Sequence, residues 1–199
     1  MAQQTGATSC FHSLYVKWIE QAGARVAPIQ FDLPEQEFET LIGQLNGALI
    51  TGGETDIKNL NSSYMRAAGR LYNHSRSLHA AGEAWPLWGT CMGFQVLSIL
   101  GAGDGAVLLS NAYDSEKVAM ALNLTAAAAS SRLFCPGCLT PAAALTTLTT
   151  RNVTVNLHHD GVLPSAFASG TKLGDAFTVL STNVDKKGKP FASAIEARG

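Results

Sequence analysis

The residue pattern with the clearest chemical potential is a cysteine between two glycines, inside a long apolar run. Gly89 and Gly93 flank Cys91, and the apolar residues resume after Gly93 in helix-like fashion. This pattern predicts a nucleophile elbow, a sharp strand-to-helix turn that holds a nucleophile strained and exposed. A cysteine at a helix N-terminus meets the positive end of the helix dipole, which favours the reactive thiolate. The alternative is a buried core cysteine at a strand end, and the flanking glycines favour catalysis.

A pair of glycines supplies the second candidate. Gly52 and Gly53 directly follow the apolar residues 47–51, which we expect to form a buried strand. Glycine lets backbone N–H groups point into a site, so we expect the N–H groups of Gly53 and Met92 to form an oxyanion hole. Gly52 would then lie against the substrate. A tight turn without a catalytic role is the other interpretation.

The remaining cysteines and the histidines carry weaker signals. Four cysteines in 199 residues do not indicate a disulfide scaffold. Cys135 and Cys138, separated by Pro-Gly, have the spacing of a redox pair or half a zinc site, but no second Cys/His pair completes a metal site. We expect a Pro-Gly turn there, with at most an incidental disulfide, and no metal or cofactor. His158 and His159 precede Gly161 at an expected strand end, where a substrate contact and a satisfied loop histidine both remain open.

Composition indicates one globular domain over residues 1–199, with 46% hydrophobic and 15% charged residues. A net charge of −1 gives no electrostatic case for nucleic acid or an anionic membrane. No apolar run approaches the roughly 20 residues of a membrane span. Residues 1–11 lack the basic and apolar regions of a signal peptide, whereas sequons at Asn61, Asn73, Asn123 and Asn152 hint at a secretory or lysosomal lineage.

Helices and strands alternate in the first half of the chain. We expect helices at 14–22, 35–43, 62–81 and 94–100, and strands at 25–29, 47–51 and 85–88. This order predicts a parallel sheet covered on both faces, with ligands at the carboxyl ends of its strands. Beyond Gly101 we expect antiparallel edge strands at 107–109, 118–122, 177–182 and 191–195, with short helices at 126–129 and 141–145.

Five segments resemble, in the same order, the γ-glutamyl hydrolases of the class I glutamine amidotransferase superfamily. They are residues 15–26, 45–53, 88–94, 121–123 and 179–183, within a match over roughly 14–196. The resemblance implies a flavodoxin-like α/β fold and a cysteine hydrolase that cleaves γ-linked glutamate from folyl- and antifolyl-polyglutamates. Cys91 would match the family nucleophile. His158 would match a histidine that contacts substrate, with Asp160 where the family tends to carry an aromatic residue. A lysosomal, vacuolar or extracellular location follows from the resemblance, which also allows a homodimer.

Two departures from the family pattern shape the expectation for activity. The family begins with a Pro-x-Ile-Gly-Ile-Leu strand that residues 1–11 lack, and its catalytic base lies in a Gln-Trp-His-Pro-Glu segment beyond the stretch matching 191–196. We therefore expect a chain truncated at both ends, with little hydrolase activity by itself. Two alternatives stay open: a glutaminase domain of an amidotransferase, indicated by Gln95, and a non-catalytic binding module, indicated by the absent base.

Overall fold

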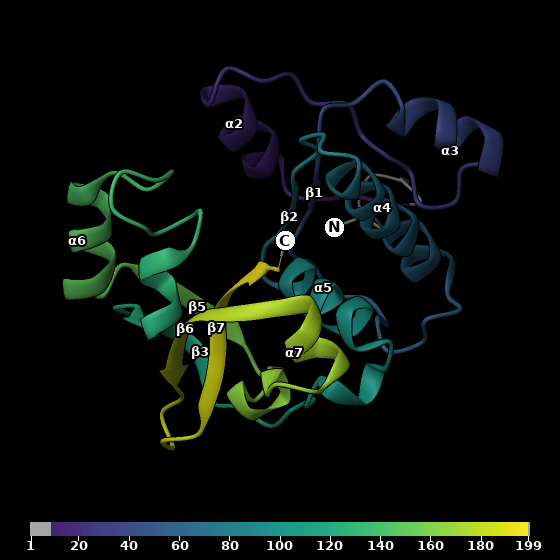
Figure 1. Ribbon diagram of the computed structural model, residues 1–199. Coiled ribbons are helices and arrows are strands. Elements are labelled where there is room, and N and C mark those ends of the chain that lie inside the picture. Colours follow the sequence, from purple (N-terminus) through teal and green to yellow (C-terminus); the bar gives the residue numbers. More distant parts are fainter. Residues whose placement is uncertain (1–8, 199) are drawn as a thin grey trace. The chain divides into compact units, whose positions relative to one another are not determined.

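The computed structural model describes residues 9–198, which divide after Leu97 into two compact units. Figure 1 labels most of their helices and strands. The expectation of one domain over 1–199 remains a prediction. Among the described residues, no helix is both long and apolar enough to cross a membrane.

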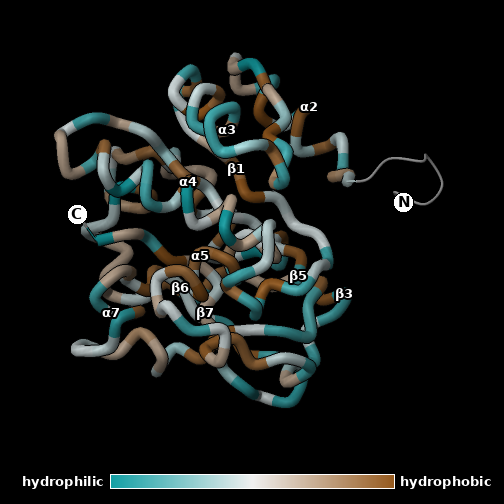
Figure 2. Tube along the Cα trace, turned by 90° about the vertical axis from the view of Figure 1, so that its right-hand side faces the viewer, coloured by the Kyte–Doolittle hydropathy of each residue, from teal (hydrophilic) through white to brown (hydrophobic). Residues whose placement is uncertain are grey.

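The first unit holds a short parallel pair of strands, β1 (Ala48–Ile50) and β2 (Leu87–Gly89). They align in register, with Ala48 opposite Leu87 and Ile50 opposite Gly89. Because the strands run in parallel, their carboxyl ends lie at the same edge. Residues 51–53 and 90–91 therefore leave the pair side by side. Figure 2 shows hydrophobic residues along β1 and in α5 (Met92–Ala102), the helix that follows β2.

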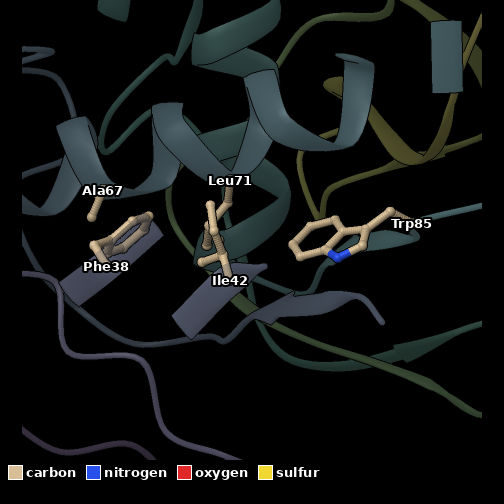
Figure 3. Packing of buried hydrophobic residues seen from close by; sticks show 5 residues of the cluster. All are labelled: Phe38, Ile42, Ala67, Leu71 and Trp85. Carbon is tan, nitrogen blue, oxygen red and sulfur yellow. The ribbon is translucent and has the colours of Figure 1, made fainter. Parts of the chain in front are cut away.

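Helices α2 (Ser13–Gln21), α3 (Glu35–Ile42) and α4 (Ser63–Ala80) complete the first unit. The starts of α4 and α2 follow ordinary capping chemistry: the Ser62 side chain accepts a hydrogen bond from the N–H of Met65, and the His12 side chain accepts one from the N–H of Leu14. The core between α3 and α4 is drawn in Figure 3. It consists of Phe38, Ile42, Ala67, Leu71 and Trp85.

Trp85 fixes the approach to β2 as well as filling this core. Its indole N–H donates to the carbonyl of Leu45 at 2.8 Å, while the Ser75 hydroxyl donates to the Trp85 carbonyl at 2.8 Å. A buried tryptophan with a satisfied N–H contributes apolar burial without an unpaired donor. The segment that leads into Cys91 is thereby anchored to both α4 and the turn before β1.

The second unit is built on antiparallel strands. A two-stranded sheet pairs β3 (Ser115–Met120) with β5 (Thr154–His158), and a three-stranded sheet has the order β4 (Asn123–Leu124), β6 (Phe177–Val184), β7 (Pro190–Ala197). The register of β3 shifts between Glu116 and Val118, where Lys117 takes a φ of 55°. That combination is a β-bulge.

Helical segments of this unit cover its sheets or connect them. They are η1 (Gly105–Val107), η2 (Ala126–Ser130), α6 (Ala142–Thr150), η3 (Pro164–Phe167) and α7 (Lys172–Ala176). Ala128 of η2, Phe134 and Leu180 of β6 form a buried cluster, with the half-buried Leu145 of α6 packed against it. The alanine-rich segments therefore contribute to a core rather than to linkers.

Two expected strands are wrong. Residues 25–29 form no strand, and Pro28 within them lacks the N–H that a sheet ladder needs. Val107 instead ends the 3₁₀ turn η1, and Leu108 and Leu109 follow it. The turn begins because the Asp104 side chain accepts from the N–H of Ala106. Of these residues, Leu109 retains an isolated antiparallel bridge to Gly161.

The fold class is confirmed at the coarse level, because the chain is mixed α and β. Within residues 9–198, β1 and β2 are the one parallel pair and the other ladders are antiparallel. The sheets are small, and β1 and β2 span three residues each.

Candidate active site

Cys91 lies on a strained turn between β2 and α5. Its φ is +58°, in the left-handed region that residues with a side chain seldom occupy. Cys91 is exposed and forms no disulfide. The N–H of Thr90 donates to the carbonyl of Ile50, which ties the end of β2 to the end of β1. The N–H of Gly93 then donates to Thr90 at 2.9 Å, which starts the helix. Backbone strain of this kind clusters at functional sites, and the elbow geometry is the one that the sequence predicts.

The glycines on either side of Cys91 are required by close packing. A Cβ on Gly89 would lie 2.5 Å from the carbonyl oxygen of Gly93 and 2.7 Å from a methyl of Leu97. A Cβ on Gly93 would overlap the carbonyl group of Ile50. Only glycine lets β1, β2 and the first turn of α5 approach this closely. The Gly-x-Cys-x-Gly spacing therefore has a steric reason in this structure.

The structure brings the glycine pair and the elbow together. A Cβ on Gly52 would lie 3.0 Å from Cβ and 3.5 Å from Sγ of Cys91. A Cβ on Gly53 would lie 3.4 Å from the terminal methyl of Met92. Four residues singled out in the sequence, Gly52, Gly53, Cys91 and Met92, thus meet at the carboxyl edge of the β1–β2 pair.

Tyr15 joins this group, although no sequence pattern marked it as a site residue. The N–H of Gly52 donates to the Tyr15 hydroxyl oxygen at 2.9 Å, and a Cβ on Gly52 would lie 2.5 Å from that oxygen. Because the hydroxyl accepts here, its own proton stays available for another acceptor. Trp18, one turn further along α2, contacts Trp88 of β2 edge-on with ring centroids 6.0 Å apart. These two contacts hold α2 against the strand pair.

His158 lies in the second unit, at the end of β5. Its Nδ1 is 2.8 Å from the carbonyl oxygen of Asp160, and its Nε2 is 3.3 Å from Oδ1 of Asn156. The ring packs edge-on against Phe191, with centroids 4.9 Å apart. Burial lowers the pKa of His158 below its usual 6.5, partly opposed by the hydrogen bond to Asp160. The neutral ring that results donates through Nδ1, because a carbonyl oxygen can only accept.

His159 has a different environment from its neighbour. It is exposed, and its Nε2 lies 3.1 Å from a carboxylate oxygen of Glu116 on the paired strand β3. Cross-strand pairs of this type contribute little when solvent surrounds them. Of the two adjacent histidines, His158 is the half-buried one, and its ring packs against Phe191.

The described part of the chain offers no set of ligands for a metal ion. No group of three or more His, Cys, Asp or Glu residues there is placed to hold a metal ion. Cys135 and Cys138 are joined in a disulfide. The turn and the disulfide expected there are confirmed.

Comparison with known proteins places this geometry in a family. The Peptidase C26 family model matches residues 2–185. The chain belongs to the Peptidase C26 family. The chain is also 39% identical to a γ-glutamyl hydrolase from Homo sapiens, over 92% of the chain and 54% of that relative. It is 33% identical to γ-glutamyl hydrolase B of Dictyostelium discoideum and 36% identical to a γ-glutamyl hydrolase of Mus musculus, over 92% of the chain and 51% and 55% of those relatives.

This Peptidase C26 chain spans about half the length of the curated relatives that it matches. The resemblance that the sequence motifs indicated is confirmed by these matches. The family match also supports a fold of the class I glutamine amidotransferase type.

Proposed function

We propose that this protein hydrolyses γ-glutamyl bonds of folyl and antifolyl poly-γ-glutamates, with Cys91 as the nucleophile. The observation that carries the proposal is the exposed Cys91 at a φ of +58°, directly before α5 and beside Gly52. The names of the similar proteins, all γ-glutamyl hydrolases, supply the bond type. The substrate is then a small molecule, and no cofactor or metal is needed for the reaction.

The chemistry divides the hydrolysis into two steps. The Cys91 thiolate attacks the γ-carbonyl carbon, a C–S bond forms, and the carbonyl oxygen becomes an oxyanion. The N–H groups of Gly53 and Met92 are the proposed donors to this oxyanion. Collapse of the intermediate breaks the C–N bond, and the leaving glutamate nitrogen takes up a proton. Water then attacks the thioester, which releases the shortened folyl product and restores the thiol.

Gly52 and Tyr15 have a supporting role in this scheme. The N–H of Gly52 is already bound to the Tyr15 hydroxyl, so Gly52 holds this phenol beside the thiol instead of contacting the oxyanion. The Tyr15 O–H can then donate to a substrate oxygen next to Sγ. This arrangement makes Gly52 part of the substrate site through the residue that it positions.

His158 is proposed to contact the substrate. Its Nδ1 is committed to the Asp160 carbonyl, so Nε2 is the nitrogen that faces a ligand or Asn156. A glutamate carboxylate beside Nε2 would favour the protonated ring, which can donate through both nitrogens. Substrate binding and proton uptake at His158 are then coupled.

The finer features of fold and location belong to the same proposal. We infer a flavodoxin-like sheet, supported by the parallel β1–β2 pair and by the elbow at its carboxyl edge. We also infer a lysosomal, vacuolar or extracellular location. The four sequon asparagines are exposed, and a disulfide is most common in oxidising compartments. A homodimer remains part of the proposal.

The test compares two substrates with the wild-type protein and Cys91→Ala. Folyl tri-γ-glutamate and free glutamine are each incubated with both proteins, and released glutamate is measured. We expect slow release of glutamate from the triglutamate, no release from glutamine, and no release from either substrate with Cys91→Ala. Release from glutamine alone would instead support a glutaminase, the class that Gln95 indicates. Triglutamate binding by the wild-type protein without any release would support a non-catalytic module.

A further inference from the structure

A disulfide lies in an exposed turn of the second unit, and neither of its cysteines has a part in the proposed hydrolysis. It joins Cys135 and Cys138, whose Cα atoms are 5.2 Å apart, across Pro136 and Gly137. Both intervening residues are exposed, and Gly137 takes a φ of +79° that suits a tight turn. The half-buried cysteines are therefore close to solvent on a segment that a small molecule can approach.

The turn is closed by backbone hydrogen bonds that do not involve the sulfur atoms. Four such bonds, of 2.9 to 3.3 Å, run across it: Cys135 N–H to Ser131, Cys138 N–H to Cys135, Leu139 N–H to Arg132 and Thr140 N–H to Leu133. These bonds fix the path of the chain on both sides of the disulfide. The spacing of the two cysteines is thus set by the backbone.

Packing anchors the same segment to the sheet. Phe134 is buried against Ala128 and Leu180, and its N–H donates to the Ser131 hydroxyl oxygen at 2.9 Å. Arg132 donates to the carbonyl of Ala197 at 2.9 Å and pairs with Glu196 on β7. The turn has a core contact and a sheet contact, and neither involves a sulfur atom.

A bridge across two residues also restricts the unfolded chain little. Stabilisation by this route grows with the logarithm of the loop that the disulfide closes, so the shortest loops gain least. The Cys135–Cys138 disulfide is therefore neither needed to close the turn nor placed where it stabilises the fold most. It does have the two-residue spacing at which a pair of thiols can re-form a disulfide readily.

We propose that Cys135 and Cys138 form an exchange-active redox site that reacts with low-molecular-weight thiols of the glutathione type. A thiolate attacks one sulfur, the S–S bond breaks, and the other cysteine leaves as a thiolate that takes up a proton. A second thiol attacks the mixed disulfide, which gives two protein thiols and one small-molecule disulfide. Two thiols are oxidised and one protein disulfide is reduced, so two electrons are transferred. The reverse sequence restores the bond.

The test uses a Cys10→Ser/Cys91→Ser variant, so that Cys135 and Cys138 are the only cysteines left. The protein is equilibrated in buffers of different glutathione to oxidised-glutathione ratio, quenched with acid, alkylated with N-ethylmaleimide and weighed by mass spectrometry. We expect the ratio of dithiol to disulfide protein to rise tenfold for each tenfold rise in [GSH]²/[GSSG]. We also expect an unchanged near-ultraviolet circular dichroism spectrum and full reoxidation when oxidised glutathione is added.

Two outcomes of the glutathione series would overturn the proposal. One is a disulfide that stays oxidised through the whole series, and the other is alkylation that increases only as the folded spectrum is lost. A Cys135→Ser/Cys138→Ser variant serves as the matched control for the fold. We expect it to keep the native spectrum, and its failure to fold would identify the disulfide as a structural one.

Discussion

Replacing Gly52 with alanine tests the packing that we describe around the thiol. The new methyl would lie 2.5 Å from the Tyr15 hydroxyl oxygen and 3.0 Å from Cβ of Cys91, both closer than van der Waals contact. Overpacking of this kind costs about 1–3 kcal/mol, and the lower chain entropy of unfolded alanine offsets about 0.4–1 kcal/mol. We therefore expect Gly52→Ala to lose about 1–2 kcal/mol of stability.

A double-mutant cycle with Tyr15→Phe isolates the part of this loss that the hydroxyl causes. Tyr15→Phe alone removes the hydrogen bond from the Gly52 N–H, which costs about 0.5–1.5 kcal/mol. In the double variant the methyl no longer meets a hydroxyl, so we expect a loss smaller than the sum by about 1 kcal/mol. The assay is urea unfolding followed by tryptophan fluorescence.

The neighbouring glycine provides the control for this cycle. A Cβ on Gly53 meets only the terminal methyl of Met92, at 3.4 Å, so Gly53→Ala should change stability by less than about 0.5 kcal/mol. Losses that add within about 0.5 kcal/mol in the Gly52→Ala/Tyr15→Phe double variant would refute the contact between these residues.

Three further predictions concern reactivity and pH. Cys91 should react with iodoacetamide faster than Cys10, since both are exposed but only Cys91 lies at a helix N-terminus. Peptide mass spectrometry measures the two labelling rates, and faster labelling of Cys10 would contradict the elbow. Because burial lowers the pKa of folded His158, the unfolded chain protonates first, so stability should fall as the pH drops through 6.5. His158→Gln should remove that part of the loss in urea titrations, and an unchanged pH profile would contradict it. Hydrogen bonds from the N–H groups of Asp114 and of the turn after β6 lower the pKa of Asp185 below 3.8. Ionised Asp185 therefore stabilises the fold above pH 3.8, and this stabilisation is lost as the pH falls through the lower pKa of the folded state. Acid unfolding of Asp185→Asn should therefore show a weaker pH dependence below about 4, and a profile identical to wild type would exclude this role.

The elbow could be predicted because its cause is local. The turn at Cys91 needs a glycine two positions away on either side, and the sequence shows both directly. The helix over residues 63–80 was predictable for the same reason, since its capping serine and its apolar period lie within the segment. Features set by neighbouring residues in the chain therefore carry through to the structure.

Tyr15 could not be predicted, because its role depends on a contact across 37 positions. Its periodicity marks it only as part of an amphipathic helix, and nothing in the sequence shows which residue of α2 faces Gly52. The bulge at Lys117 and the short strand β4 were missed because they depend on how strands pair. Tertiary packing decides these features, whereas residue spacing records only local preference.

The central claim, that Cys91 is the nucleophile for a γ-glutamyl carbonyl, is tested most directly by covalent labelling. The protein is incubated with a glutamate analogue that carries a diazoketone at the γ position, and the adduct is counted by intact mass and located by peptide mapping. We predict one adduct per chain, on Cys91, whose formation is slowed by excess folyl tri-γ-glutamate. Labelling spread equally between Cys10 and Cys91, or labelling that the polyglutamate does not slow, would contradict the claim.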